Sequence, residues 1–113
     1  MKKLTVCAVL VTAFIFQFCS SSKKAQKAAA ATTYTANVQP IIAASCSPCH
    51  IEGKGNKKTL SNYTAAKDNI DDIIARIEKN PDERGFMPFK HPKLPDSTIQ
   101  MFVKWKADGL KEN

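Results

Sequence analysis

No segment of this 113-residue chain alternates apolar and polar residues, and no internal repeat is present. Alternation with a period of two marks a half-buried strand, so its absence argues against a β-sheet domain. The sequence also lacks a Ser-His-Asp set, a phosphate-binding loop and clustered carboxylates beyond solvated helix faces. Acyl and phosphoryl transfer depend on groups of this kind. We therefore expect a protein that is not an enzyme.

Most of the formal net charge of +7 lies outside the part of the chain that is expected to fold. From Thr32 onward, twelve Lys and Arg residues stand against ten Asp and Glu residues, a net charge of +2; the other five lysines precede this point. Nucleic-acid binding needs a basic stripe across a fold, so we expect no nucleic-acid partner. A local basic patch for an acidic protein partner is compatible with this balance.

The N-terminus has the pattern of a bacterial export signal. Residues 1–3 are positively charged at two positions, and residues 4–18 form an apolar run broken only by threonines and Gln17. At about 1.5 Å per residue the run spans roughly 22 Å, short of a hydrocarbon core of about 30 Å. We therefore interpret residues 1–18 as a signal peptide rather than a membrane-spanning helix.

Cys19 ends this run and is followed by three serines, an order that resembles a bacterial lipoprotein signal. The resemblance implies lipidation of Cys19 and an exported protein anchored on the periplasmic side of a bacterial membrane. The bulky residues 16–18 depart from the small residue usual before such a cysteine. An ordinary cleaved signal, or an uncleaved anchor, is the alternative. Residues 19–33, rich in Ala, Ser and Lys, are then a flexible tether.

Residues 34–113 are expected to form one all-α domain of about four short helices. Helical spacing of apolar residues and capping residues predict helices over 35–44, 63–67, from 70 to near Asn80, and from Asp96 or Ser97 to a Gly109 cap. Gln100 is placed to complete a capping box with Ser97. A core of this size is marginal without a cofactor or cross-link to stabilise it.

The most informative motif is Cys46-Ser47-Pro48-Cys49-His50. Two thiols three positions apart and followed at once by histidine are the attachment pattern for c-type haem. Each thiol forms a thioether with one vinyl group, and His50 is the proximal iron ligand. We therefore predict one covalently bound haem c.

These cysteines could have three uses other than haem attachment. A thioredoxin-like redox pair needs a βαβ context, which the sequence lacks. A structural zinc site needs four well-spaced ligands, and only Cys46, Cys49, His50 and His91 are candidates. A disulfide between the two motif cysteines is the remaining alternative.

With these residues in place, the chain resembles the small monohaem cytochromes c of bacteria over about residues 34–109. The resemblance rests on the helix before Cys46, the attachment motif, the Met87-Pro88 pair and a C-terminal helix carrying Trp105. It implies a cytochrome c fold wrapped around the haem, with Met87 as the second axial ligand of the iron. A thioether ligand stabilises ferrous iron and raises the potential. His91, four residues after Met87, is the alternative ligand.

The resemblance implies a one-electron carrier that serves redox partner proteins. The alternatives are a five-coordinate haem sensor or haem enzyme subunit and, with less support, a thiol–disulfide protein. Phe86, Phe89 and Trp105 are expected to wall the haem pocket, and Met101 to lie in the core. The candidates for a propionate partner are Lys57, Lys58, Arg76 and Trp105.

Overall fold

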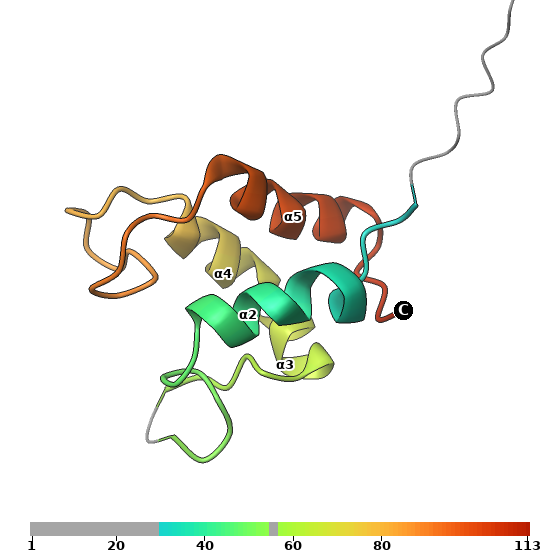
Figure 1. Ribbon diagram of the computed structural model, residues 1–113, viewed down its shortest axis with the longest axis horizontal. Helices are drawn as coiled ribbons and strands as arrows, with labels where there is room; N and C mark the ends of the chain where they lie inside the picture. The colour runs from blue at the N-terminus through green and yellow to red at the C-terminus, as the bar shows by residue number, and fades with distance from the viewer. Residues whose placement is uncertain (1–29, 55–56) are drawn as a thin grey trace, which may run out of the picture.

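The computed structural model describes residues 30–54 and 57–113, which form helices, turns and loops without a strand. A π-helix, η1 (Tyr34–Val38), runs directly into α2 (Gln39–Ser45). Three helices follow, α3 (Tyr63–Asp68), α4 (Ile70–Ile77) and α5 (Asp96–Ala107) (Figure 1). The predicted all-α class is confirmed for this part of the chain. The predicted signal peptide and Cys19 lie outside the described residues.

The first helix starts one residue earlier than predicted and opens with a wider turn. The Thr33 hydroxyl accepts a hydrogen bond from the Ala36 N–H and caps η1. Pro40 brings no N–H to the carbonyl of Ala36, four residues before it, so regular α-helical bonding is interrupted here. The Gln39 N–H bonds to the carbonyl of Tyr34 instead. Pro40 then occupies the first turn of α2, as predicted.

The α3 and α4 helices follow the predicted pattern at their starts and on their buried faces. Asn62 caps α3, because its side chain accepts a hydrogen bond from the Ala65 N–H at 2.9 Å. Three isoleucines of α4 are buried at the predicted spacing: Ile70, Ile73 and Ile77. This spacing turns one apolar stripe toward the other helices.

The predicted end of α4 near Asn80 is wrong, because the helix ends at Ile77. The next backbone groups bond to side chains of the following loop. Lys93 donates to the carbonyl of Glu78 at 2.8 Å, and Glu83 accepts from the Asn80 N–H at 2.5 Å. These bonds replace the ones that a further helical turn would make.

The start of α5 lacks the predicted side-chain cap. No cap bond from Asp96 or Ser97 forms among the described residues, and the Pro95 carbonyl accepts from the Thr98 N–H at 2.9 Å. At the other end, Gly109 has φ +91° and lets the chain leave the helix in the left-handed region. The N–H groups after α5 bond back to Lys106 and Trp105, which is a Schellman cap. The predicted Gly109 cap is confirmed.

The core lies between the first helix, α4 and α5. Its fully buried side chains are Val38, Ile42, Phe102 and Trp105. Trp105 is 0% exposed and lies at the centre of this core. Met101, expected in the core, is 39% exposed because the buried face of α5 follows residues 99, 102 and 105. One residue step turns a helical side chain by about 100°.

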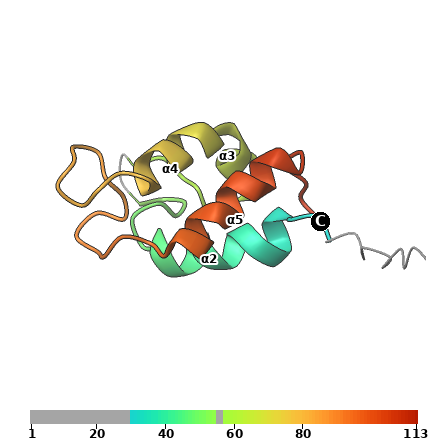
Figure 2. The same ribbon diagram turned by 90° about the horizontal axis from the view of Figure 1, so that it is seen from above.

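The two ends of the folded chain meet at the end of the molecule opposite its long loops (Figure 2). The Tyr34 N–H donates to the Lys111 carbonyl at 2.9 Å, and the Trp105 indole N–H donates to the same carbonyl at 2.8 Å. Asp108 accepts from the Thr32 N–H at 2.6 Å. The other end carries two loop regions, residues 46–54 with 57–62 and residues 78–95 (Figure 1).

Candidate functional site

Residues 46–50, which we call the Cys-His segment, continue directly from α2. Cys46 caps this helix, and its N–H bonds to the Ile42 carbonyl at 2.9 Å. The His50 N–H bonds to the Cys46 carbonyl at 3.0 Å, so the segment closes a helical turn of its own. Local backbone bonds thus place both thiols and the imidazole relative to α2.

A cavity of about 430 Å³ opens beside this segment. Its volume lies within the range of cofactor pockets, roughly 300–1,000 Å³. Cys46, Cys49 and His50 line it, as do Met87 and His91. Its apolar wall includes side chains from several elements: Leu60, Ile73, Ile77, Leu94 and Phe102. The structure therefore brings the predicted attachment residues and the candidate iron ligands to one largely apolar cavity.

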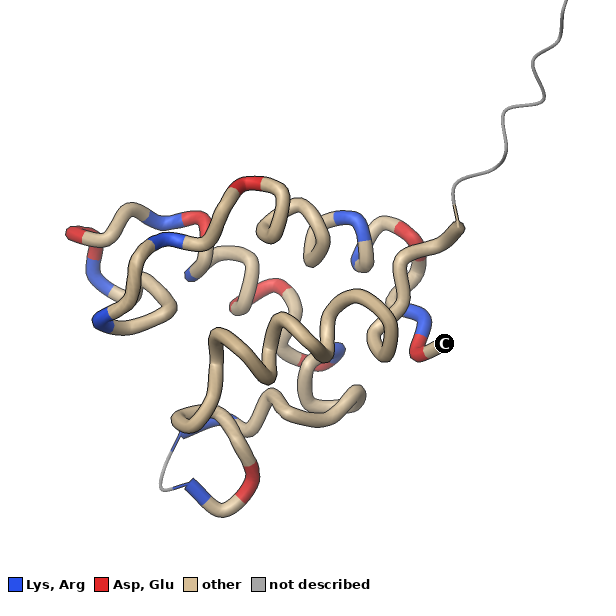
Figure 3. Tube along the Cα trace, viewed as in Figure 1, with Lys and Arg blue, Asp and Glu red and all other residues tan. Residues whose placement is uncertain are grey.

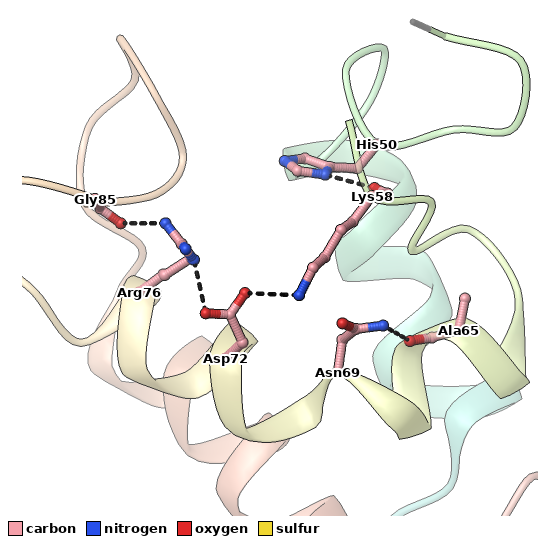
Figure 4. A network of polar contacts seen from close by, with 7 residues as sticks. All are labelled: His50, Lys58, Ala65, Asn69, Asp72, Arg76 and Gly85. Carbon is pink, nitrogen blue, oxygen red and sulfur yellow. Dashed lines mark hydrogen bonds and ion pairs between the residues drawn. The ribbon is translucent and has the colours of Figure 1, made fainter. Parts of the chain in front are cut away.

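The orientation of His50 is set by one hydrogen bond. Its Nδ1 lies 2.7 Å from the carbonyl oxygen of Lys58. A carbonyl oxygen only accepts, so Nδ1 carries the hydrogen, and in the neutral ring Nε2 keeps its lone pair. Figure 4 shows the second ring nitrogen pointing away from Lys58. A histidine held in this way has the tautomer needed to bind a metal through Nε2.

Met87 reaches the cavity from residues 78–95, which we call the Met87 loop. Its N–H donates to the carbonyl of Arg76, in the last turn of α4, at 3.2 Å. The Arg76 guanidinium also donates to the Gly85 carbonyl at 3.4 Å. Between Gly85 and Met87, the two residues that these bonds hold, Phe86 is buried, and Met87 itself is half-buried. This part of the loop therefore packs against the rest of the protein. Met87 is therefore held from α4, by a residue 11 positions earlier in the sequence.

The environment of the two motif cysteines differs from that of a reactive thiol pair. Both are free, with Cys46 half-buried and Cys49 exposed. Burial raises the pKa of the Cys46 thiol and keeps it protonated. Cys46 also sits at the C-terminus of a helix, whereas redox-active pairs gain thiolate character at a helix N-terminus.

Charge on the cavity wall comes from outside the first helix, since residues 30–51 contain no Lys, Arg, Asp or Glu (Figure 3). Lys57, Lys58 and Arg76 line the cavity together with Asp72. An anionic group bound there would meet three cationic side chains. Trp105 is absent from the described lining, and its indole N–H is used by Lys111, so it is not placed to bind a propionate.

The three aromatic residues expected to wall the pocket behave differently from one another. Phe89 lines the cavity although it is 67% exposed. Phe86 and Trp105 are buried, but neither belongs to the described lining. Phe102, a fully buried core residue, also forms part of the wall. Helical spacing finds buried residues but does not reveal which of them a cavity adjoins.

A polar network beside the cavity escaped prediction from the sequence. Arg76 donates to Asp72 at 2.9 Å, and the Lys58 ammonium lies 3.6 Å from the same carboxylate (Figure 4). The hydrogen bond from Arg76 is the main cause that lowers the pKa of Asp72. The i, i+4 spacing of Asp72 and Arg76 signals their pairing. Nothing in the sequence signals that Lys58 and Gly85 join them.

No family model matches the chain, and neither a curated protein nor a solved structure matches it. Among residues 30–54 and 57–113, no group of three or more His, Cys, Asp or Glu side chains is arranged to hold a metal ion. The zinc site considered from the sequence is thus not assembled by these residues.

None of the described helices combines the length and hydropathy required to cross a membrane.

Proposed function

We propose that the protein is a small monohaem c-type cytochrome that carries one electron between redox partner proteins. The observation that supports this best is the convergence of Cys46, Cys49, His50 and Met87 on one cavity, from segments 37 residues apart. Haem c, when bound, supplies an iron that accepts and releases a single electron. The chain supplies attachment, ligation and an apolar enclosure.

The donor set and the cavity fit haem c. Each motif thiol can add across one vinyl group, forming a carbon–sulfur bond while its hydrogen goes to the neighbouring carbon. His50 offers Nε2 because Lys58 holds Nδ1. Met87 offers a soft thioether, which favours the ferrous state and raises the potential. The aliphatic wall would shield the group from water, and the cationic side chains of the lining could neutralise its acidic substituents.

The site contains what electron transfer needs and does not depend on a substrate. With haem c bound, His50 and Met87 would both be available to ligate the iron, and an iron with two protein ligands would need little reorganisation on electron exchange. Cys49 and Pro48 are exposed beside the cavity, which gives a partner protein a short path to its contents. The proposed partners are redox proteins, one giving and one taking the electron.

The predicted location remains part of the proposal. Lipidated Cys19 and the tether predicted over residues 19–33, whose last two residues belong to the folded part because Thr32 is buried and Thr33 caps the first helix, would keep the carrier at a bacterial membrane surface, on the periplasmic side. Replacing Cys19 with Ala should release the protein into the soluble fraction. If the variant stays in the membrane fraction, the lipid-anchor proposal is wrong.

Expression together with a c-type haem assembly system tests the proposal. We expect a haem-stained band on a denaturing gel and a mass increase of one haem per chain. The reduced protein should bind carbon monoxide slowly, because Met87 occupies the sixth position. Rapid binding would favour the five-coordinate sensor or enzyme. A haem-free protein with reversibly oxidised Cys46 and Cys49 would favour the thiol–disulfide alternative.

A further inference from the structure

One carboxylate, that of Asp72, connects the residues that support both proposed iron ligands (Figure 4). Its Oδ1 accepts from Arg76 Nε at 2.9 Å, and its Oδ2 lies 3.6 Å from Lys58 Nζ. The Lys58 carbonyl is the hydrogen-bond partner of His50. The Arg76 carbonyl accepts from the Met87 N–H at 3.2 Å. Asp72 therefore stands between the two sides of the cavity.

The neighbouring aspartate shows that this placement is specific. Asp71 pairs with Lys106 of α5 at 2.6 Å and is 76% exposed. It is absent from the described cavity lining, whereas Asp72 belongs to it. Both carboxylates lie in the first turn of α4, where a negative charge is favourable. They consequently share the first turn of the helix and differ in what they reach.

The Asp72 contacts are too exposed to matter much for global stability. The side chains of Asp72 and Arg76 are each 41% exposed, and that of Lys58 is 63% exposed. Exposed ion pairs contribute little to the free energy of unfolding. Their geometric effect is different, because Gly85 and Met87 belong to a long loop with few other bonds to α4. A small local restraint can therefore decide how often that loop opens.

We propose that Asp72 is a positioning residue that keeps the Met87 loop closed on the cavity while the support of His50 stays in place. It acts through Arg76 on the loop and through Lys58 on the segment that orients the imidazole. The inference rests on the proposed function, since its readout is the iron–Met87 bond. When the carboxylate is replaced by an uncharged amide, the acceptor for Arg76 becomes weaker and the Lys58 ion pair is lost, so the guanidinium is aimed at Gly85 less firmly and the loop opens more often.

Cyanide binding to the oxidised holoprotein measures this opening, because the ligand enters only when Met87 leaves. We expect Asp72→Asn to bind cyanide about fivefold faster than wild type, the factor that corresponds to losing one modest contact. Asp72→Glu should recover part of the wild-type rate. The matched control Asp71→Asn should bind cyanide at the wild-type rate. Arg76→Lys, which keeps the charge but loses the forked geometry, should resemble Asp72→Asn.

Thermal unfolding of the same proteins separates positioning from a general loss of stability. Asp72→Asn and Asp71→Asn should unfold at similar temperatures although only the first speeds cyanide binding. Equal cyanide rates in these two variants, with Met87→Ala clearly faster, would overturn the inference and leave the proposed function standing. If wild type attaches no haem, or if Met87→Ala binds cyanide no faster, the proposed function fails and the inference fails with it.

Discussion

The two sides of the cavity are built in opposite ways. The Cys-His segment takes its position from α2, through backbone bonds between residues four positions apart. The Met87 loop spans residues 78–95 and takes its position from α4, through Arg76. One side is local in sequence and the other is not. A local turn is restored whenever its helix forms, whereas the loop depends on contacts that can be lost singly.

The difference is visible in charge as well. The first helix and the Cys-His segment are uncharged, while the Met87 loop contains four Lys and Arg residues and three Asp and Glu residues (Figure 3). Two of these charged side chains fasten the loop's own backbone, Lys93 at Glu78 and Glu83 at Asn80. We therefore expect the Cys-His segment to lose its role only when its cysteines or histidine are replaced. The position of the Met87 loop should be sensitive to many substitutions.

The largest expected effect removes the chemistry of the Cys-His segment. In the double variant Cys46→Ala and Cys49→Ala, no thiol is left to form a thioether, so covalently held haem should be lost completely. Haem staining of a denaturing gel measures this directly. Cys19→Ala is the control, since it removes a cysteine outside the motif and should stain as wild type does. A stained band from the double variant contradicts the assigned attachment sites.

The next effect concerns the Met87 loop. Met87→Ala should lower the reduction potential by roughly a tenth of a volt or more, a fraction of the roughly 0.8 V that axial ligands span. His91→Ala should leave the potential near that of wild type, although both residues line the cavity. A redox titration decides between them. If His91→Ala moves the potential and Met87→Ala does not, the two assignments must be exchanged.

Each loop region has a glycine with a positive φ, so substitutions at these two positions compare the backbone strain that the two regions tolerate. Gly53 and Gly85 have φ of +76° and +88°, a region that costs other residues about 1–2 kcal/mol. A Cβ at Gly85 would lie 3.3 Å from the Arg76 guanidinium, whereas one at Gly53 meets nothing within 4 Å. Gly85→Ala should therefore destabilise more than Gly53→Ala in denaturant unfolding, and it alone should speed cyanide binding. Equal behaviour of both variants would refute the claim that Arg76 closely supports this loop.

The smallest effect lies at the end of the molecule that neither side of the cavity touches. The Lys104 hydrogen bond, with help from the Thr32 N–H, lowers the pKa of Asp108 to about 2. A lowered pKa in the folded state stabilises the protein above the unfolded pKa of about 3.9, and this contribution is lost as the pH falls toward 2.

Asp108→Asn removes that contribution. The variant should be slightly less stable than wild type at neutral pH, and the difference should vanish as the pH approaches 2. Unfolding midpoints of both proteins across this range measure it. The haem spectrum of the variant at neutral pH should be unchanged. A constant difference in stability at all pH values would show that the carboxylate charge is not the cause.

The features that could be predicted from the sequence are those set by bonds between near neighbours in the chain. Features set by contacts with other parts of the fold could not be predicted. The start of α3 at Tyr63 and the Gly109 cap depend on bonds between near neighbours, and both were predicted. The attachment motif is likewise local, and the structure places its three functional residues on one cavity. The end of α4 was predicted too late because Lys93 and Glu83 compete for its last backbone groups from outside the helix.

Residues whose role depends on tertiary contacts could not be found in advance. The sequence shows Arg76 as one charge on a helix, without its bonds to Gly85 and Met87. Trp105 was predicted to wall the pocket because aromatic residues suit haem, yet its indole serves the junction of the chain ends. Met101 was expected in the core, but the helical phase of α5 turns it outward.

The central proposal is that His50 and Met87 are both ligands of one haem iron through which the protein would carry one electron. A redox titration of the matured protein, followed by absorption spectroscopy, tests it most directly. We predict a single one-electron transition, a six-coordinate low-spin iron in both states, and sulfur-to-iron charge-transfer absorption in the oxidised form that Met87→Ala abolishes. A five-coordinate iron in either state, or a spectrum that Met87→Ala leaves unchanged, would contradict the account.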